Sequence, residues 1–373
     1  MRFQIEKTKL LSALNTVIGA VPNKATIQVL NNFAIRLEGN ILEISATDLD
    51  LGIRVKLEVQ AEADGAVVVN ARRLLDLIKG LIDPKIEILT VEVIDYLVTV
   101  RWSERGKASI TGFDVSDFPP LPDVADGESF ELGKSELDFL AGKTLFSVST
   151  DQNRQNLNGA YMDMRPGKLI MVATDGHRLG KAFIELEGNT IEKGFIIPPK
   201  AIQFALKSIP NDSTIEIRVS DTYVLFANDG VQIVSKLIEG PYPKYEAVIP
   251  SSFQRTVQLN RTDFFNKIST VISMANARTR MLRLRLDGNQ MELSASDANI
   301  GGDSTEALSV VHEGEGVYDI GFNGLYMLEV LKLCQSEEVI LRMNGPLSAC
   351  IIEPVGTDMN CMFLLMPLRL VEE

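Results

Sequence analysis

The sequence predicts an α+β fold of three homologous domains, each with two helices on one face of antiparallel sheets. The first observation behind this prediction is a motif that occurs three times, as ATDLDLG from Ala46, ATDGHRLG from Ala173 and ASDANIG from Ala295. The second is the spacing, because the copies begin 127 and 122 residues apart in a chain of 373 residues. A repeat of about one third of the chain indicates duplicated domains.

Two further landmarks accompany each copy of the motif. A segment with helical spacing of apolar residues begins 23, 24 and 26 residues after the Asp of each copy. A proline-bearing closing segment begins 70, 67 and 69 residues after the same Asp, at Phe118, Tyr242 and Met366. We therefore predict domains at residues 1–123, 124–251 and 252–373, a size that is typical of single domains.

Each third is predicted to open with an amphipathic helix. Apolar residues recur there at the spacing of one buried helix face. The three sets are Leu10, Leu11, Leu14, Val17, Ile18 and Val21; Leu137, Leu140, Leu145 and Val148; and Phe264, Phe265, Ile268, Val271 and Ile272. Asn260 and Thr262 are candidate N-caps of the third of these helices.

Hairpins and a second helix complete each third. Residues 32–37 with 41–46, and 282–286 with 291–295, flank Gly-Asn turns that favour hairpins. The second helices are predicted at residues 71–81, 199–209 and 323–334, followed by the strand pairs 85–89 with 97–102, 214–219 with 223–227, and 339–343 with 348–352. Hairpins between helices favour antiparallel sheets with the helices gathered on one face.

The Asp of the motif lies where a strand runs into its turn. An Asp at such a place accepts backbone N–H groups and stabilises the turn. We expect this local structural role for Asp48, Asp175 and Asp297.

Composition narrows the class of protein. Hydrophobic residues make up 45% and charged residues 23%, as in folded domains. Neither an N-terminal apolar run nor a segment long enough to span a bilayer is present, so we expect no membrane partner and a cytoplasmic location. Cys334, Cys350 and Cys361 match neither a disulfide framework nor a metal motif, so buried reduced thiols are expected.

Basic residues are concentrated in the six predicted helices. These helices together carry a formal charge of +7, although the chain carries −13. Lys and Arg on exposed helix faces could serve solubility alone. If the helices instead face one way, around a ring, they form a positive surface that contacts phosphates without reading sequence.

Three segments carry a resemblance to a known family. The motif ATDGHRL, the segment KLIEGPYPKYEAVIP that begins at Lys236 and the terminal MPLRL resemble the bacterial DNA polymerase III beta subunits, the replication sliding clamps. The resemblance covers the whole chain. It implies a non-catalytic processivity factor, without metal or cofactor, whose head-to-tail homodimer forms a six-domain ring around duplex DNA.

The resemblance also implies a peptide-binding cleft between the second and third domains. The DNA polymerase III alpha subunit, the clamp loader, other polymerases and repair proteins would dock short apolar peptides there. The cleft residues carried over are Leu157, Thr174, Gly176, His177, Arg178, Leu179, Pro243, Val248, Asn323, Tyr326, Met366, Pro367, Leu368, Arg369 and Leu370. Core packing is the alternative role for Leu179, Val248 and Met366.

Two more sets of residues follow for the ring. The expected DNA contacts are Lys24, Arg72, Arg73, Lys200 and Lys207, and the expected dimer contacts are Ile110, Ile272, Met274 and Arg280. The sequence departs from the family pattern at Ala247, at Gln155 and Asn156, and in the extension Val371, Glu372 and Glu373.

Two other classes of function compete with a clamp. A hydrolase could use Asp175 and His177, but the nucleophile-elbow, zinc-protease and P-loop motifs are absent from the sequence. His312 is the only other histidine, too few for a His-rich zinc site. A scaffold whose basic helices bind acidic proteins is the third possibility, and a dimer near twice 41.1 kDa would favour the clamp.

Overall fold

In the computed structural model, which describes residues 1–24, 26–297, 301–356 and 360–370, the chain forms two compact units. The first unit comprises residues 1–137 and 200–237, and the second comprises residues 138–199 and 238–373. The units differ from the three predicted domains because each unit contains a sheet to which two successive repeats contribute strands.

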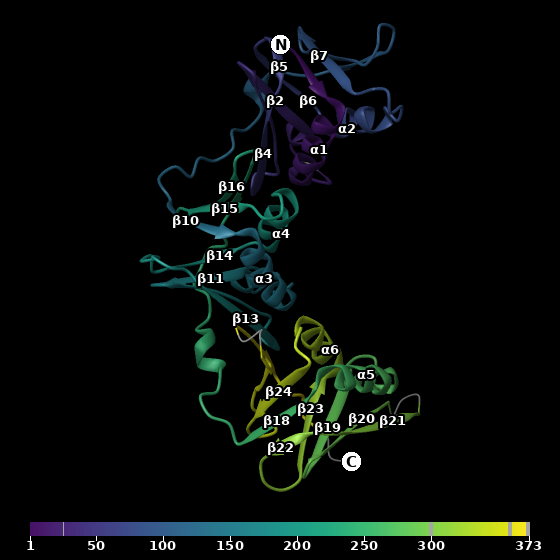
Figure 1. The fold of residues 1–373 in the computed structure, drawn as a ribbon, viewed down its shortest axis with the longest axis vertical. Coiled ribbons are helices and arrows are strands. Elements are labelled where there is room, and N and C mark those ends of the chain that lie inside the picture. The colour runs from purple at the N-terminus through teal and green to yellow at the C-terminus, as the bar shows by residue number, and fades with distance from the viewer. Residues whose placement is uncertain (25, 298–300, 357–359, 371–373) are drawn as a thin grey trace. The chain divides into compact units, whose positions relative to one another are not determined.

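The first unit contains a five-stranded and an eight-stranded sheet, in which all neighbouring strands are antiparallel (Figure 1). The five-stranded sheet has the order β5 (Gln60–Ala63), β1 (Arg2–Glu6), β7 (Ile88–Ile94), β8 (Leu97–Arg101), β9 (Lys107–Thr111). The eight-stranded sheet has the order β10 (Glu128–Gly133), β15 (Thr214–Val219), β16 (Tyr223–Asn228), β17 (Val231–Lys236), β4 (Leu51–Glu58), β3 (Ile41–Thr47), β2 (Asn32–Glu38), β6 (Gly65–Asn70).

The second unit contains a nine-stranded and a four-stranded antiparallel sheet. The nine-stranded sheet has the order β14 (Lys193–Ile197), β11 (Ala160–Arg165), β12 (Lys168–Thr174), β13 (Arg178–Glu185), β26 (Cys361–Leu365), β25 (Cys350–Pro354), β24 (Glu338–Met343), β18 (Arg255–Asn260), β22 (Val311–Glu313). The four-stranded sheet has the order β21 (Asp303–Ser309), β20 (Gln290–Ser296), β19 (Met281–Asp287), β23 (Tyr318–Asn323).

Six α-helices occur in the described residues, all at the predicted places. They are α1 (Lys7–Val17), α2 (Ala71–Gly80), α3 (Lys134–Thr144), α4 (Pro199–Ser208), α5 (Arg261–Val271) and α6 (Gly324–Leu333). Helices α1 and α2 lie together on one side of their sheets, as do α5 and α6 (Figure 1). No helix in the described part of the chain is long and apolar enough to cross a bilayer.

Asparagine side chains cap three of these helices. Asn70 accepts the backbone N–H of Arg73, and Asn260 accepts that of Asp263. The predicted N-cap Asn260 is therefore confirmed, whereas Thr262 lies inside the helix. Each cap satisfies one or two of the N–H groups that a helix leaves unpaired at its start.

A basic residue at the start of the first helix of each repeat binds the end of the second helix. Lys7 Nζ donates to Leu81 O (3.1 Å), and Lys134 Nζ donates to Ile209 O (2.6 Å). The guanidinium of Arg261 donates to Leu331 O in the last turn of α6 (3.4 Å) and to Ser336 O beyond that helix (2.9 Å). A cation there satisfies unpaired carbonyls and the negative end of the helix dipole. Successive basic residues of this set lie 127 residues apart, a spacing that was not predicted as part of the repeat.

Two expectations about strands were wrong. Each repeat opens with a short strand, β1, β10 or β18, that was not predicted. The strand expected at residues 85–89 begins only at residue 88, because Asp83 precedes Pro84 and accepts the N–H of Lys85 (2.9 Å), which forms a turn. The hairpin that follows turns at Asp95 and Tyr96, both with positive φ.

The two large sheets are continuous across the boundaries between repeats. In the first unit β4 of the first repeat pairs with β17 of the second, with Gly52 opposite Val234. In the second unit β13 of the second repeat pairs with β26 of the third, with Leu179 opposite Leu364. Backbone hydrogen bonds between strands therefore hold successive repeats together. The three cysteines are free and buried, as expected.

Candidate functional site

The second copy of the motif forms a tight turn between β12 and β13. Asp175 Oδ1 accepts the backbone N–H groups of His177 (2.8 Å) and Arg178 (3.0 Å). Thr174 Oγ1 donates to the carbonyl of Arg178 (2.7 Å). Gly176 has a φ of +90°, a conformation that glycine adopts without strain. The turn therefore fixes the backbone that carries His177 and Arg178.

The first copy of the motif has the same turn. Asp48 Oδ1 accepts the N–H groups of Asp50 (3.2 Å) and Leu51 (2.7 Å). The local role predicted for Asp48 and Asp175 is thus confirmed. In the third copy residues 298–300 lie outside the described residues, so the prediction for Asp297 stays a prediction.

Arg178 is enclosed by charged and aromatic side chains. Its Nε donates to Asp175 Oδ2 (3.0 Å), and Nη1 binds Glu329 on α6. Its guanidinium carbon lies 4.2 Å from the ring centre of Tyr326 and 5.4 Å from that of Phe146. The Arg178 side chain is only 14% exposed. These contacts link β13 to α6 through one cation.

The C-terminal segment after β26 crosses the same region. The N–H of Met366 donates to the carbonyl of His177 (2.8 Å), and the N–H of Leu368 donates to that of Gly321 on β23 (2.8 Å). A Cβ added at Gly321 would lie 2.9 Å from Leu370 Cδ2. A side chain at this position would therefore have to displace the side chains of Met281 and Leu370, and it would lie tightly against Leu368 O at 3.0 Å.

An apolar cluster lies on one face of the nine-stranded sheet. Its buried members are Ile170, Val172, Leu179, Tyr245, Ala349, Ile351 and Leu364. Leu179 is 1% exposed, so it packs in the core. Val248, on the short helix Tyr245–Val248, and Met366 are 53% and 39% exposed. Of the three residues for which core packing was the alternative, only Leu179 is buried.

The segment that carries Pro243 and Val248 is anchored on β11. Tyr242 stacks on Tyr161 with ring centres 4.8 Å apart. Tyr245 donates its hydroxyl hydrogen to Asp163 Oδ2 (2.7 Å), and the guanidinium of Arg165 binds the same carboxylate. Burial and the bond to Asp163 raise the pKa of the Tyr245 phenol above its usual value. These contacts hold the segment over the apolar cluster.

The structure thus joins some of the predicted cleft residues by direct contacts. His177, Arg178, Tyr326 and Met366 are linked as described above, and Thr174 and Gly176 shape their turn. Asn323 uses its side chain to cap α6, accepting the N–H groups of the first helical turn. Leu157 is buried, whereas Pro243 and Arg369 are exposed and Pro367 is half-buried.

Sequence reasoning missed Phe146, Glu329 and Leu364 at this place. Phe146 and Glu329 contact Arg178, and Leu364 belongs to the apolar cluster. Phe146 and Leu364 resemble ordinary core residues in sequence, and Glu329 resembles an ordinary acid on a helix surface. No sequence signal separated them, because each acquires its neighbours through long-range folding.

The five residues expected to contact DNA all belong to the first unit and are all exposed. Lys200 Nζ forms an ion pair with Asp48 Oδ2 (2.7 Å), which neutralises part of its charge. Arg72 Nη2 donates to Asn23 Oδ1 (3.2 Å). Lys24, Arg73 and Lys207 complete the set on the described surface.

The residues expected at a dimer contact lie in different environments. Ile110 lies on β9, an edge strand of the five-stranded sheet. Ile272 is buried, and a Cβ added at Gly324 would lie 2.4 Å from it. Met274 is exposed. A second edge strand, β21, was missed because nothing in its sequence marks it as an edge.

The positions at which the sequence departs from the family pattern lie in different surroundings. Ala247 is exposed on the short helix Tyr245–Val248. Asn156 Nδ2 donates to the carbonyl of Pro241 (3.0 Å) and so contributes to anchoring the same segment. The extension Val371, Glu372 and Glu373 lies outside the described residues.

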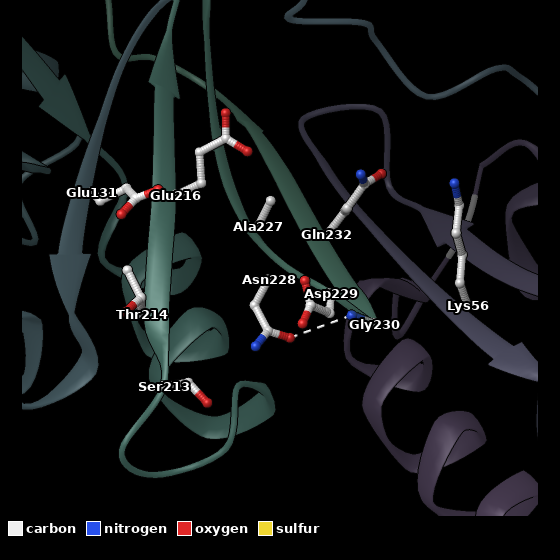
Figure 2. Close-up of a pocket in the computed structure, with 10 residues that line it drawn as sticks. All are labelled: Lys56, Glu131, Ser213, Thr214, Glu216, Ala227, Asn228, Asp229, Gly230 and Gln232. Atoms are coloured by element: carbon white, nitrogen blue, oxygen red, sulfur yellow. Dashed lines mark hydrogen bonds between the residues drawn. The ribbon is translucent and has the colours of Figure 1, made fainter.

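A polar hollow of about 610 Å³ lies elsewhere, in the first unit (Figure 2). Its residues are Lys56, Glu131, Ser213, Thr214, Glu216, Ala227, Asn228, Asp229, Gly230 and Gln232. Glu131 and Glu216 lie opposite each other on paired strands. None of the predicted site residues lines this hollow. In the described residues no group of three His, Cys, Asp or Glu side chains could hold a metal ion.

Comparisons with known proteins cover the whole chain. Models of the DNA polymerase III beta subunit match it in order: the N-terminal domain at residues 1–122, the central domain at 131–244 and the C-terminal domain at 246–369. A beta sliding clamp of Vibrio cholerae is 31% identical over 373 residues, covering 99% of this chain and 100% of that protein.

Solved structures agree with these matches. A crystal structure of a DnaN sliding clamp from Pseudomonas aeruginosa bound to griselimycin has a TM-score of 0.93 at 26% identity, covering 99% of this chain and 100% of that one. The DNA polymerase sliding clamp of Bacillus subtilis has a TM-score of 0.93 at 25% identity, covering 100% of both chains.

Proposed function

Because the chain belongs to the family of DNA polymerase III beta subunits, the beta sliding clamps, we propose that it encircles duplex DNA as a head-to-tail homodimer. Its function is that of a DNA sliding clamp, a processivity factor and not an enzyme. DNA, a polymerase and a second copy of the chain are the partners that the family implies. The details of the ring and of its peptide site are our proposal.

One observation carries the proposed ring: two of three equivalent strand pairs are formed within the chain. In each, the strand that follows the motif in one repeat pairs with the last long strand of the next repeat, as β4 with β17 and β13 with β26. The remaining equivalent strands are β21 in the third repeat and β9 in the first, and both are sheet edges. Pairing β21 of one copy with β9 of another repeats the same joint, and two such joints close a ring.

The strand register of this joint follows from the repeats. Within the motif hairpins Thr47 lies opposite Gly52 and Thr174 opposite Leu179. In the third repeat Ser296 lies opposite Asp303. Asp303 is therefore the counterpart of Gly52 and Leu179.

The other side of the joint is fixed in the same way. Each repeat has an isolated β-bridge at an equivalent position. These bridges join Phe113 to β6, Ile238 to β14 and Leu368 to β23. Val234 and Leu364 each lie four residues before the bridge of their repeat, and so does Ser109. Asp303 is then expected opposite Ser109, which places Ser304 opposite Ala108 in the antiparallel pair.

The proposed DNA surface uses exposed cations of the first unit. Lys24, Arg72, Arg73, Lys200 and Lys207 are all exposed in a chain whose net charge is −13. Long basic side chains on helices contact phosphates without reading bases. Binding is therefore expected to be independent of sequence and to weaken steeply with salt.

The proposed peptide site lies around Arg178 and the apolar cluster. Exposed Val248 and Met366 offer apolar contacts, and His177 and Arg178 offer polar ones. Such a surface suits short peptides with apolar anchors and a polar or acidic flank. We propose that the alpha subunit of DNA polymerase III, the clamp loader, other polymerases and repair proteins bind here.

We also propose domain boundaries after residues 123 and 251, and a cytoplasmic location. The first boundary falls in the interval between two family matches, residues 122 to 131, whereas the second lies a few residues after the change of match between 244 and 246. The location follows from the proposed partners, because replication proteins and DNA meet in the cytoplasm of bacteria.

Disulfide trapping tests the ring and its register. Ala108→Cys combined with Ser304→Cys places one cysteine on each strand of the proposed joint, facing the same side of the sheet. Mild oxidation is expected to give a covalent species near twice 41.1 kDa on a non-reducing gel. The native Cys334, Cys350 and Cys361 are buried, so little background is expected.

The matched control shifts one cysteine by a single residue. Ala108→Cys with Thr305→Cys points the two thiols to opposite faces of the sheet, because side chains alternate along a strand. This variant is expected to remain mostly monomeric on the same gel. Equal cross-linking of both variants, or of neither, would contradict the proposed joint.

A further inference from the structure

We propose that Glu329 is an internal substitute for an acidic group of the docked peptide, so that the site recognises a carboxylate by exchanging it for Glu329. This inference rests on the proposed peptide site around Arg178. It adds a preference for acidic peptides and names the residue that competes with them. The contacts of Arg178 carry it.

The guanidinium of Arg178 is held firmly on three sides. Asp175 binds its Nε, and Tyr326 and Phe146 lie over it at 4.2 and 5.4 Å. Asp175 itself is fixed by two backbone N–H groups and is 15% exposed. The planar cation therefore stays in place whichever anion occupies its remaining side.

Glu329 lies on the remaining side of the Arg178 guanidinium and is itself exposed to solvent. It binds Arg178 Nη1 from α6, and its side chain is 50% exposed, against 14% for Arg178. Water can solvate the half-exposed carboxylate as the ion pair opens, so Glu329 is held less tightly than a buried partner would be. Of the two described carboxylates that bind Arg178, Glu329 is thus the one that can move into water more easily.

A peptide carboxylate would be held near Arg178 by the other contacts of the peptide. Apolar anchors bound near Val248 and Met366 would hold a peptide acid close to Arg178 and raise its effective concentration there. The bond it forms is the same charge-assisted bond that Glu329 gives up. Replacement of Glu329 by the peptide carboxylate therefore costs little free energy. A peptide with an acidic side chain at the matching position is expected to bind more tightly.

The first repeat lacks this arrangement. In the first repeat Leu51 stands where Arg178 stands in the second, three residues after the motif Asp. There Asp48 pairs instead with Lys200 of α4. The exchangeable anion is therefore a feature of the second motif and not a general requirement of the turn.

The test compares two capped seven-residue peptides with leucine and phenylalanine anchors, identical except that one carries aspartates where the other carries asparagines. Their affinities for the full-length protein are measured by fluorescence anisotropy. Glu329→Gln is expected to raise the ratio of aspartate-peptide to asparagine-peptide affinity by about two- to fivefold, the size of an exposed ion pair. An unchanged or lowered ratio would overturn the inference.

Two further variants distinguish the direct contact between Glu329 and Arg178 from a long-range effect of the negative charge. Glu329→Asp keeps the charge but shortens the side chain, and it is expected to raise the ratio as well. Glu337→Gln removes an equal charge from an exposed position just beyond α6 and is expected to leave the ratio unchanged. If Glu337→Gln raised the ratio as much as Glu329→Gln, long-range charge would explain the effect and the exchange would be rejected.

The same measurements keep the two proposals apart. Binding of the asparagine peptide to the unaltered protein, lost in Met366→Ala, supports the peptide site whatever Glu329 does. Failure of both peptides to bind would reject the proposed site itself. Circular dichroism of each variant, expected to match that of the unaltered chain, shows that folding is not the cause of any change.

Discussion

Four buried or half-buried tyrosines make the stability of the fold depend on pH. Burial raises the pKa of Tyr161, Tyr242 and Tyr245, and it raises that of Tyr318 to about 12. A raised pKa means that the folded state holds the phenolic proton more tightly than the unfolded chain, whose value is about 10. The stability from these groups is therefore fully present below pH 10 and is lost as the pH rises through the folded values.

Tyr245→Phe tests this at one residue. The variant loses the hydrogen bond to Asp163 (2.7 Å) and is expected to be less stable at pH 8 by about 1.5–3 kcal/mol, the typical value for a bond to a charged group. The fall in unfolding free energy between pH 10 and 12, measured by urea denaturation, is expected to be shallower in the variant. Identical slopes for both proteins would contradict the account of Tyr245.

Single residues show which features the sequence could predict and which it could not. The N-cap Asn260 and the turn role of Asp175 could be predicted, because each acts within three residues of itself. The environment of Arg178 could not be predicted. Its contact with Glu329 joins residues 151 apart in the chain, and local pattern holds no information about such a pair.

At the scale of elements, helix ends are linked by a repeated cation. Lys134 Nζ donates to Ile209 O at 2.6 Å and to Asn211 Oδ1 at 2.9 Å, so it holds the end of α4 against the start of α3. Lys134→Met keeps most of the aliphatic length but removes both bonds. We expect it to lower the unfolding free energy by about 1.5–3 kcal/mol, as for bonds to a charged group.

Thermal denaturation measures the effect, and Lys79→Met is the matched control. Lys79 lies exposed in the last turn of α2, and the same substitution there is expected to change stability by less than about 0.5 kcal/mol. A midpoint for Lys134→Met as high as that of the control would show that the bond at the helix end contributes nothing.

Helices were easier to predict than strand partners. All six α-helices follow from apolar spacing, which is a local property of about 10 residues. The pairing of β4 with β17 joins Gly52 to Val234, far apart in sequence. Each strand shows alternation of apolar and polar residues, but neither sequence indicates with which other strand it pairs. The opening strands were missed because each runs directly into the first helix of its repeat, with no turn residue between the two patterns.

For the whole molecule, the threefold repeat determines most of what the protein does. It was visible in sequence because landmarks recur at similar distances within each repeat, and the three family matches also divide the chain into three. The basic helices were visible as well. The joint between repeats was not, because it consists of backbone hydrogen bonds between β4 and β17 and between β13 and β26.

The central claim is that the chain encloses duplex DNA in a ring of two copies. The Ala108→Cys, Ser304→Cys protein, mixed while reduced with a circular plasmid and then oxidised, is expected to remain on the circle through about 1 M salt, where simple electrostatic binding is lost. Cutting the plasmid once should release it, because a closed ring slides off a free end. Equal release from circular and linear DNA at high salt would contradict encirclement.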